Sequence, residues 1–336
     1  MTPYTNTTLT VSHSLTYENE PISDSYFEHK YEWIGGRLCE EDENGPYPLP
    51  YDSNEIDRLD LQHYIIRYAL NGYFTAPVNF EKVKRVCDVG CGSGIWMMEM
   101  SAIYPNTRFY GCDVRSAFPE STCPENCEFS ICNILKGLIY PSGYFDYVYQ
   151  RTLLGSIPEK EWKPLISELV RCTAINGLVE LTELAFWLNN AGPHYKIIQE
   201  KVYKALEIRG INSRVLNRLP EFLKQAGLVN IGLKIRKIPC GKWGGQIGEY
   251  MRDFVMQAMN FYKIFCARQD VITDTDVDEW DYDTEILMKE FEEYKTFATV
   301  VSIVGRKPEP LGITIVEDTR MFKRIVKELN SLEYNV

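Results

Sequence analysis

The chain has 336 residues, 45% of them apolar and 25% charged, and this balance favours one globular domain with elaborations. Its 36 basic and 47 acidic residues give a net charge of −11, which disfavours general nucleic-acid binding because phosphate neutralisation needs a basic surface. No stretch reaches the roughly 18 consecutive apolar residues that a membrane span requires, so no membrane association is expected.

Residues 1–28 are polar and are expected to form a flexible arm, and residues 29–80 form an N-terminal helical segment. Within that segment "EIDRLDLQHYIIRYAL", 55–70, repeats apolar positions at helical spacing and predicts an amphipathic helix. The first 30 residues lack the charged and apolar parts of a signal peptide. We therefore expect a cytoplasmic protein, with the nucleus as the alternative.

Residues 81–308 alternate strand and helix patterns, and we assign them to one domain. Strands are expected over 83–90, 107–113, 127–132, 143–150, 177–184, 227–238 and 297–308, and helices over 93–104, 161–173, 193–208, 218–226 and 246–294. This alternation predicts an α/β fold in which a mostly parallel sheet carries helices on both faces. The segments near 185–212 and 240–294 exceed ordinary connection lengths and predict a helical lid, and residues 309–336 form a helical tail.

The first strand of this domain ends in "VCDVGCGSG", residues 86–94, where Gly90, Gly92 and Gly94 follow Asp88. Ligands of open parallel sheets bind at such a strand-to-helix turn. The third glycine comes one place earlier than in the dinucleotide fingerprint, and a carboxylate beside the turn would repel a pyrophosphate. Asp113 ends the next strand, where an acid accepts hydrogen bonds from ribose hydroxyls. Together these residues predict a nucleoside ligand with a cationic end.

Over residues 50–308 the chain resembles the class I S-adenosylmethionine-dependent methyltransferases. Beside the glycine turn, "YFDYVYQR" (144–151) looks like the family's fourth strand, "INGLVELTE" (175–183) like its fifth and "VGRKP" (304–308) like its closing strand. More narrowly, "YPLPYDSNEIDRLDLQH" (47–63) is similar to the N-terminal signature of fungal, LaeA-like methyltransferases related to secondary-metabolism regulators. The resemblance implies a Rossmann-like, seven-stranded sheet whose last strand runs antiparallel.

The resemblance also implies where S-adenosylmethionine would bind. The loop from Asp88 to Gly94 would hold the methionyl part and Asp113 the ribose. The remaining cofactor positions carried over by the resemblance are Gly90, Cys91 and Gly92 in the loop, Val114, Asn133 and Ile134 around the adenine, and Gln150 and Arg151 on the methyl-donor side. Asn133 stands where many members have Asp, and "AINGL" replaces the usual K-P-G-G turn.

Candidate catalytic residues are His63 in the N-terminal helix, His194 in the lid region and Arg151. A sulfonium is an activated methyl donor, so a base is needed only if the acceptor holds its proton near neutral pH. His63 has the alternative of fixing its helix by a hydrogen bond, and His194 that of starting a helix. Trp187, Trp243, Tyr195 and Phe261 are candidates for an aromatic acceptor pocket, with a place in the core as their alternative.

The sequence predicts an enzyme that methylates a small-molecule acceptor, in the manner of secondary metabolism, by in-line displacement. The alternative is a regulatory protein that binds the cofactor and acts through protein partners or methylates a protein. A nicotinamide-dependent dehydrogenase is disfavoured by the glycine spacing. No metal is expected, because Cys123, Cys127 and Cys132 lack the usual zinc spacing and a nearby histidine. Homodimerisation stays open.

Overall fold

The computed structural model describes residues 9–10, 30–34, 37–40, 50, 52–119, 122–273, 280, 286–309 and 319–333. Two sheets are present in this part of the chain. The smaller sheet is antiparallel and consists of β1 (Leu9–Thr10), β2 (Lys30–Ile34) and β3 (Arg37–Glu40). The predicted arm, 1–28, therefore lies outside the described residues apart from β1, and the predicted helical segment, 29–80, also contains a hairpin.

The larger sheet has seven strands in the order β6-β5-β4-β7-β8-β10-β9. Their bounds are β4 Arg85–Val89, β5 Arg108–Asp113, β6 Cys127–Ile131, β7 Phe145–Arg151, β8 Thr173–Leu184, β9 Val229–Pro239 and β10 Phe297–Arg306. The pairs from β6 to β8 are parallel, whereas β10 runs antiparallel to both β8 and β9. The predicted Rossmann-like sheet with an antiparallel last strand is thus confirmed.

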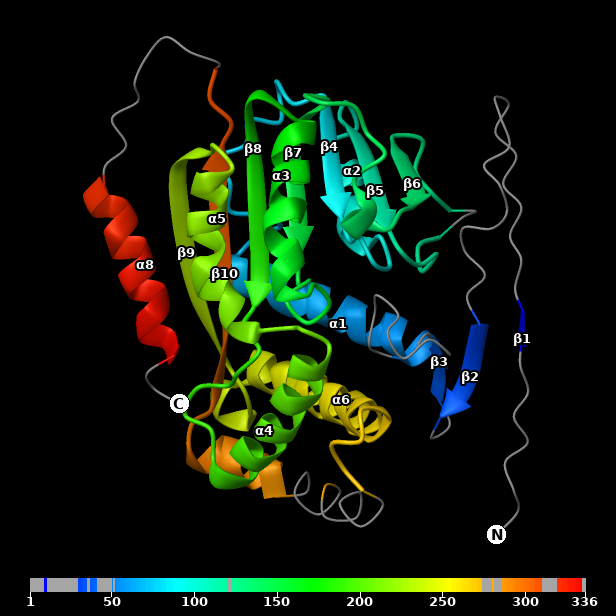
Figure 1. Ribbon diagram of the computed structural model, residues 1–336, viewed down its shortest axis with the longest axis vertical. Helices are drawn as coiled ribbons and strands as arrows, with labels where there is room; N and C mark the ends of the chain where they lie inside the picture. The colour runs from blue at the N-terminus through cyan, green and yellow to red at the C-terminus, as the bar shows by residue number, and fades with distance from the viewer. Residues whose placement is uncertain are drawn as a thin grey trace.

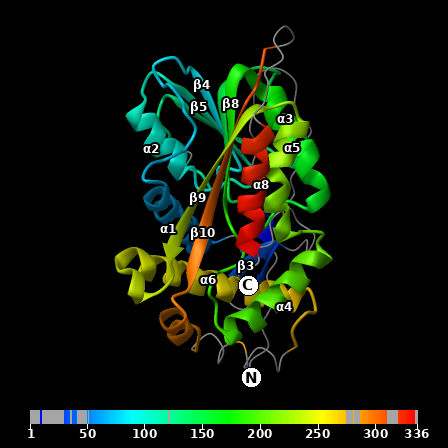
Figure 2. The same cartoon turned by 90° about the vertical axis from the view of Figure 1, so that its left-hand side faces the viewer.

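Helices cover both faces of this sheet, as Figures 1 and 2 show. One face carries α2 (Ile95–Ile103), and the other carries α3 (Trp162–Cys172), α5 (Leu219–Gln225) and α8 (Thr319–Glu333). The sequence of α3 explains its packing, because Trp162, Leu165, Ile166 and Leu169 recur on one side of a 3.6-residue helix and are all buried. On the opposite face Trp96 of α2 stacks on Tyr149 of β7, with ring centroids 4.4 Å apart.

A third group of helices lies at the carboxyl ends of the parallel strands, with α1 across the middle of Figure 1 and α4 and α6 below it. It consists of α1 (Ser53–Leu70), α4 (Pro193–Ile208) and α6 (Gln246–Arg268). These helices share a hydrophobic core that is separate from the two cores beside the sheet. The predicted helical lid over one end of the sheet corresponds to α4 and α6.

The prediction of one continuous helical segment over 246–294 is wrong. The helix α6 stops at Arg268, and Asp270 then adopts a left-handed backbone with φ of 53°. The N–H of Val271 turns back to the carbonyl of Cys266, so the chain leaves the helix there. Residues 286–293 form a separate helix before β10, and most of the residues between the two helices are not described.

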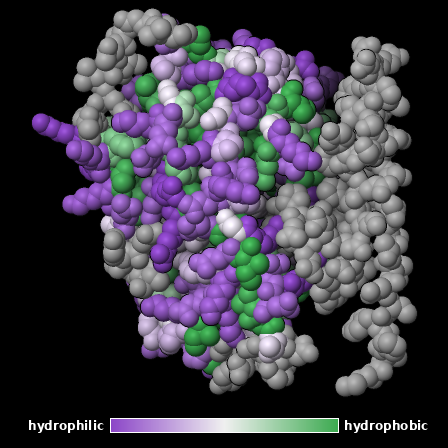
Figure 3. Space-filling view, in the orientation of Figure 1, coloured by the Kyte–Doolittle hydropathy of each residue, from purple (hydrophilic) through white to green (hydrophobic). Residues whose placement is uncertain are grey.

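The surface shown in Figure 3 is mainly hydrophilic, with apolar residues in small separated groups. Within the described ranges, no helix combines the length and apolar character needed to cross a bilayer. The face of the molecule in that view therefore offers water few contiguous apolar areas.

Candidate active site

A cavity of about 440 Å³ lies where the carboxyl ends of β4, β5, β7 and β8 meet the helical lid. One end of the cavity is lined by the glycine turn and the residues that follow β5 and β6. The other end is lined by side chains of α4 and α6, while α1 contributes a wall that spans both. Of the predicted site residues, those in the cavity wall are Gly90, Gly92, Asp113, Val114, Asn133, Ile134 and Arg151. Asp88, Cys91, Gly94, Gln150, His63 and His194 are not part of that wall.

The glycine turn is held by hydrogen bonds to its own protein. The N–H groups of Gly90 and Cys91 donate to the carbonyl of Cys112 at 2.8 and 3.1 Å, and that of Gly92 donates to Oδ2 of Asp113 at 2.9 Å. Gly94 caps α2 with φ of +75°, and a Cβ there would lie 2.6 Å from the Phe129 ring. Since these N–H groups already have protein acceptors, the turn is poorly suited to cradle a phosphate.

Cys91 and Gln150 point away from the cavity. The Cys91 side chain is buried in the core on the α2 face of the sheet, and only its backbone takes part in the turn. The Gln150 side chain is fully buried, and its Nε2 donates to Oε1 of Glu183 at 2.5 Å. Both residues therefore reach a ligand in the cavity only through a neighbour.

Two carboxylates lie beside the glycine turn, Asp113 in the cavity wall and Asp88 outside it. Asp88 is 4% exposed at the end of β4, and burial raises its pKa to about 7, opposed by the positive charge of Arg151 and aided by Asp113. Burial also raises the pKa of Asp113, although the N–H groups of Gly92 and Arg115 hydrogen-bond to it and favour the ionised form. A positively charged ligand would stabilise both carboxylates.

Asn133 and Ile134 lie just beyond the end of β6, as the sequence predicts for the edge of a base-binding pocket. Oδ1 of Asn133 accepts from the N–H of Leu135 at 3.0 Å and caps a short 3-10 helix over Ile134–Lys136. This assignment leaves the Asn133 amino group as the donor toward the cavity.

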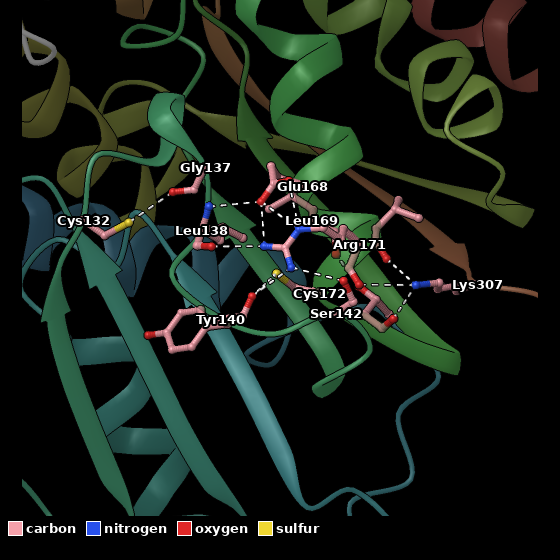
Figure 4. A network of polar contacts seen from close by, with 12 residues as sticks. Cys132, Gly137, Leu138, Tyr140, Ser142, Glu168, Leu169, Arg171, Cys172 and Lys307 are labelled. Carbon is pink, nitrogen blue, oxygen red and sulfur yellow. Dashed lines mark hydrogen bonds and ion pairs between the residues drawn. The ribbon is translucent and has the colours of Figure 1, made fainter. Parts of the chain in front are cut away.

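The segment after this turn is clamped to α3 by Arg171 (Figure 4). The Arg171 guanidinium donates to the carbonyls of Leu138 and Tyr140 at 3.0 and 2.9 Å and pairs with Glu168. Oε2 of Glu168 in turn accepts from the N–H of Leu138 at 3.1 Å. The clamp therefore supports the wall that contains Asn133 without contacting the cavity.

Arg151 lines the cavity at the end of β7, and its guanidinium contacts His63. Both terminal nitrogens of Arg151 lie 3.2 Å from Nδ1 of His63, and Nε2 of His63 lies 2.7 Å from Oε2 of Glu99. Because Arg151 can only donate, this geometry requires a neutral His63 that donates from Nε2 to Glu99. Burial, assisted by Arg151 and Arg67, lowers the pKa of His63 to about 3.

The two candidate catalytic histidines, His63 and His194, both make contacts outside the cavity. His63 is fully buried, and its one lone pair faces the Arg151 guanidinium, so it is a poor proton acceptor for a ligand. His194 is the second residue of α4, and its Nδ1 lies 2.7 Å from Oε1 of Glu290. The same carboxylate accepts the N–H groups of His194 and Tyr195, so this contact fixes the start of α4.

Sequence reasoning missed Glu183, which lines the cavity from the carboxyl end of β8. Its side chain is fully buried, and burial raises its pKa to about 7 against the hydrogen bonds from Gln150, Leu153 and Leu154. The available signal was its place at the end of a buried strand, the same signal that identified Asp113 and Arg151.

The lid end of the cavity is mostly apolar. Of the four aromatic residues predicted to form an acceptor pocket, only Tyr195 lines it. Trp187 is buried in the sheet core, and the ring of Phe261 lies under the guanidinium of Arg37 at 4.1 Å. The aromatic lining is supplied instead by Phe186, Phe254 and Tyr262.

The cysteines noted in the sequence serve local contacts. Sγ of Cys123 donates to the carbonyl of Cys127 at 3.3 Å, and Sγ of Cys132 to that of Gly137 at 3.5 Å. No group of three or more potential metal-ligating side chains occurs within the ranges that the structure covers.

Comparison with known proteins identifies the family. The family described as "Methyltransferase domain" matches residues 61–231, which is 171 of the 336 residues. The chain belongs to this family of methyltransferases. The predicted resemblance is confirmed, and a methyltransferase is favoured over a nicotinamide-dependent enzyme.

Three relatives illustrate the range of similar proteins. The chain is 27% identical to methyltransferase pytC of Aspergillus terreus, over 68% of this chain and 72% of pytC. It is 25% identical to N-methyltransferase gliN of Aspergillus fumigatus, over 79% of this chain and 98% of gliN. It is also 29% identical to the secondary metabolism regulator laeA of Aspergillus niger, over 57% of this chain and 46% of laeA.

Proposed function

We propose that this methyltransferase transfers the methyl group of S-adenosylmethionine to a small-molecule acceptor held in the same cavity. The observation that carries the proposal is the continuity of that cavity, which extends from the glycine turn and Asp113 to the apolar side chains of α4 and α6. One continuous cavity of this kind can hold a nucleoside at one end and an apolar acceptor at the other. The relatives pytC and gliN, named as a methyltransferase and an N-methyltransferase, support this reading.

The residues at the first end suit the cofactor. Asp113 would accept hydrogen bonds from ribose hydroxyls, since each of its oxygens keeps a lone pair beyond its backbone donor. Val114 and Ile134 would flank the adenine, and the Asn133 amino group would donate to a ring nitrogen. Arg151 lines the cavity and would pair with the carboxylate of the methionyl part, whereas Asp88 lies outside the wall and would favour the ammonium only through its negative charge.

When bound, the sulfonium supplies a methyl group that a nucleophile can displace directly. The protein then has to align the acceptor behind that methyl group and exclude water from it. The lid helices do both, because Met251, Phe254 and Val255 of α6 and Val202 of α4 form an apolar wall opposite the strand ends.

Isothermal titration of S-adenosylmethionine and its demethylated product tests this assignment. Asp113→Ala removes a charged acceptor of hydrogen bonds and should weaken binding by about 10- to 100-fold. Glu128→Ala, on the neighbouring β6 with an exposed side chain, is the control and should bind normally. Unchanged affinity in Asp113→Ala would mean that the nucleoside binds elsewhere.

A second candidate function is favoured by the similarity to laeA. Under it, the chain binds the cofactor but acts as a regulator through protein partners or methylates a protein. A methyl-transfer screen separates the two, because the enzyme should label a metabolite extract, whereas the regulator should bind cofactor and label no metabolite.

A further inference from the structure

Glu183 is the acidic side chain that β8 places in the cavity wall. In the sheet its neighbour Thr182 pairs with Arg151 of β7, so Glu183 lies one residue beyond the level at which Arg151 enters the site. The next residues in the chain, Leu184, Ala185 and Phe186, turn into the apolar lid end of the same cavity. Glu183 therefore stands at the border between the cofactor end and the acceptor end.

The hydrogen bonds of Glu183 fix its carboxylate but leave part of it unused. Oε1 accepts from Nε2 of Gln150 at 2.5 Å and from the N–H of Leu153 at 3.2 Å. Oε2 accepts from the N–H of Leu154 at 3.1 Å. A carboxylate oxygen accepts two hydrogen bonds, so Oε2 retains one acceptor position.

All three of these donors are neutral, although the carboxylate is fully buried. A buried carboxylate is costly unless it gains a positive partner or a proton. The three arginines that line the cavity have other contacts. Arg58 pairs with Glu55 at 2.6 Å, Arg115 donates to the carbonyl of Pro50 at 3.0 Å, and Arg151 contacts His63. The cavity therefore favours a ligand that brings its own positive charge to Glu183.

The surroundings define the rest of that ligand. The wall beyond Glu183 consists of aliphatic and aromatic side chains, chiefly Leu188, Val202, Met251, Phe254, Val255 and Met259. Such a wall suits an apolar body with few hydrogen-bonding groups.

We propose that the acceptor is an apolar amine and that Glu183 binds its nitrogen and receives its proton. This inference rests on the proposed function, since it names the substrate class of that site. The bound ammonium gives one proton to Oε2 of Glu183, and the nitrogen lone pair so freed attacks the methyl carbon. The carbon–sulfur bond breaks with its electron pair going to sulfur, which becomes a neutral thioether. The methylated nitrogen takes the positive charge that sulfur loses.

Gln150 acquires a role in this arrangement. Its Nε2 donates to Oε1 of Glu183 and thereby fixes the orientation of the Glu183 carboxylate. Gln150 is thus a positioning residue that acts on the acceptor through Glu183, rather than a direct contact of the cofactor.

The test measures binding of 2-phenylethylamine and of the uncharged 2-phenylethanol to the protein saturated with S-adenosylhomocysteine at pH 8. The wild type should bind the amine about 10- to 100-fold more tightly than Glu183→Gln does, because one charged contact is lost. The alcohol should bind both proteins alike. Amine affinity that is equal in the two proteins, or too weak to measure in the wild type, would overturn the inference.

Saturation with S-adenosylhomocysteine keeps the inference separate from the proposed function. If the homocysteine compound does not bind the wild type, the proposed function fails. If S-adenosylhomocysteine binds both the wild type and Glu183→Gln, and the two bind the amine with equal affinity, only the proposed role of Glu183 fails. If Glu183→Gln selectively weakens S-adenosylmethionine relative to S-adenosylhomocysteine, Glu183 contacts the sulfonium and the inference also fails.

A second measurement on the wild type covers the case in which Glu183→Gln does not fold. Amine binding should strengthen as the pH rises through about 7, where burial places the ionisation of Glu183, while alcohol binding should stay constant. The other charged or titratable side chains that line the cavity are Asp52, Glu55, Arg58, Asp113, Arg115, Cys132, Arg151, Tyr195 and Tyr262. Asp88 also titrates near pH 7, so the cofactor product must remain saturating at each pH. Amine affinity that is flat across this range would contradict the proposal.

Discussion

The buried carboxylate of Asp88 lowers the stability of the free protein and should favour binding of a positively charged ligand. Its carboxylate is 4% exposed, and burial raises its pKa from 3.8 to about 7. Between these values the folded protein retains a proton that the unfolded chain has lost, so stability falls as the pH rises from about 4 to 7. A cationic methionyl group would offset this cost in the complex.

Asp88→Asn should therefore stabilise the cofactor-free protein at pH 8 by roughly 1 to 4 kcal/mol while weakening its affinity for S-adenosylmethionine. Urea denaturation at pH 5 and pH 8 measures the first effect, which should be less than half as large at pH 5 as at pH 8. Calorimetric titration measures the second. A variant less stable than wild type at pH 8 would show that Asp88 is already compensated in the free protein.

His63 predicts the opposite pH trend, because its pKa is lowered in the fold. The unfolded chain takes up a proton below about pH 6.5, whereas the folded protein does so only near pH 3. The full contribution of His63 to the free energy of unfolding is therefore present above pH 6.5. It decreases by about 1.4 kcal/mol per pH unit as the pH falls from about 6.5 to about 3.

The prediction is checked by comparing wild type with His63→Leu in denaturation curves from pH 7.5 to pH 4. As the pH falls, the free energy of unfolding should decrease more steeply in the wild type than in His63→Leu, by about 1.4 kcal/mol per pH unit. The contributions of the carboxylates common to both proteins cancel in this difference. Parallel curves would mean that His63 is not held neutral against Arg151.

At the level of elements, α1 depends on a contact with the hairpin that precedes it. Asp52 caps α1 by accepting from the N–H of Glu55 at 3.1 Å, and its carboxylate also pairs with Arg37 of β3 at 2.5 and 2.6 Å. The Arg37 guanidinium lies over the ring of Phe261 in α6 at 4.1 Å. Asp52 thus joins the cap of α1 to both β3 and the lid.

Asp52→Ala should destabilise the start of α1 by about 1 to 2 kcal/mol and speed amide exchange in its first two turns. Asp52→Ser keeps a capping oxygen but not the ion pair and should recover most of the exchange protection. Asp57→Ala, exposed on the same helix, is the control. Equal exchange in all four proteins would remove any role for this cap.

The elements that the sequence predicted are those with a strong local pattern. The helices predicted over 55–70 and 193–208 match the bounds of α1 and α4. The predicted apolar face of 55–70 is only partly buried, because Tyr64 and Tyr68 are exposed and Arg58 and His63 are buried. The β2–β3 hairpin was missed, although "IGGR" at 34–37 carries a turn signal. The end of α6 was missed because a left-handed Asp270 leaves no such signal in the sequence.

The site shows a similar division. Asp113 and Arg151 were predictable because each ends a buried strand with a charge. Glu180 and Glu183 share one strand, and in the sequence only Glu183 lies next to the predicted strand end at residue 184. The Glu180 carboxylate accepts hydrogen bonds from Thr75, Tyr147 and Ser302, whereas Glu183 lines the cavity. Only the end point of β8 within the sheet distinguishes the two.

At the scale of the molecule, the two ends of the cavity differ in how they relate to the family. The match over 61–231 includes the strands that carry Asp88, Asp113 and Glu183, but it stops before α6. The end of the cavity proposed for the cofactor is therefore built from the part shared with the methyltransferase family. The acceptor end depends on a helix beyond that match, which is where individual specificity is expected.

The most direct test is a crystal structure of the protein with S-adenosylhomocysteine. We expect the ribose hydroxyls within hydrogen-bond distance of Asp113, the adenine beside Val114 and Ile134, and the sulfur facing Glu183 and the apolar wall of α6. A nucleoside bound outside this cavity, or a sulfur turned away from the lid, would contradict it.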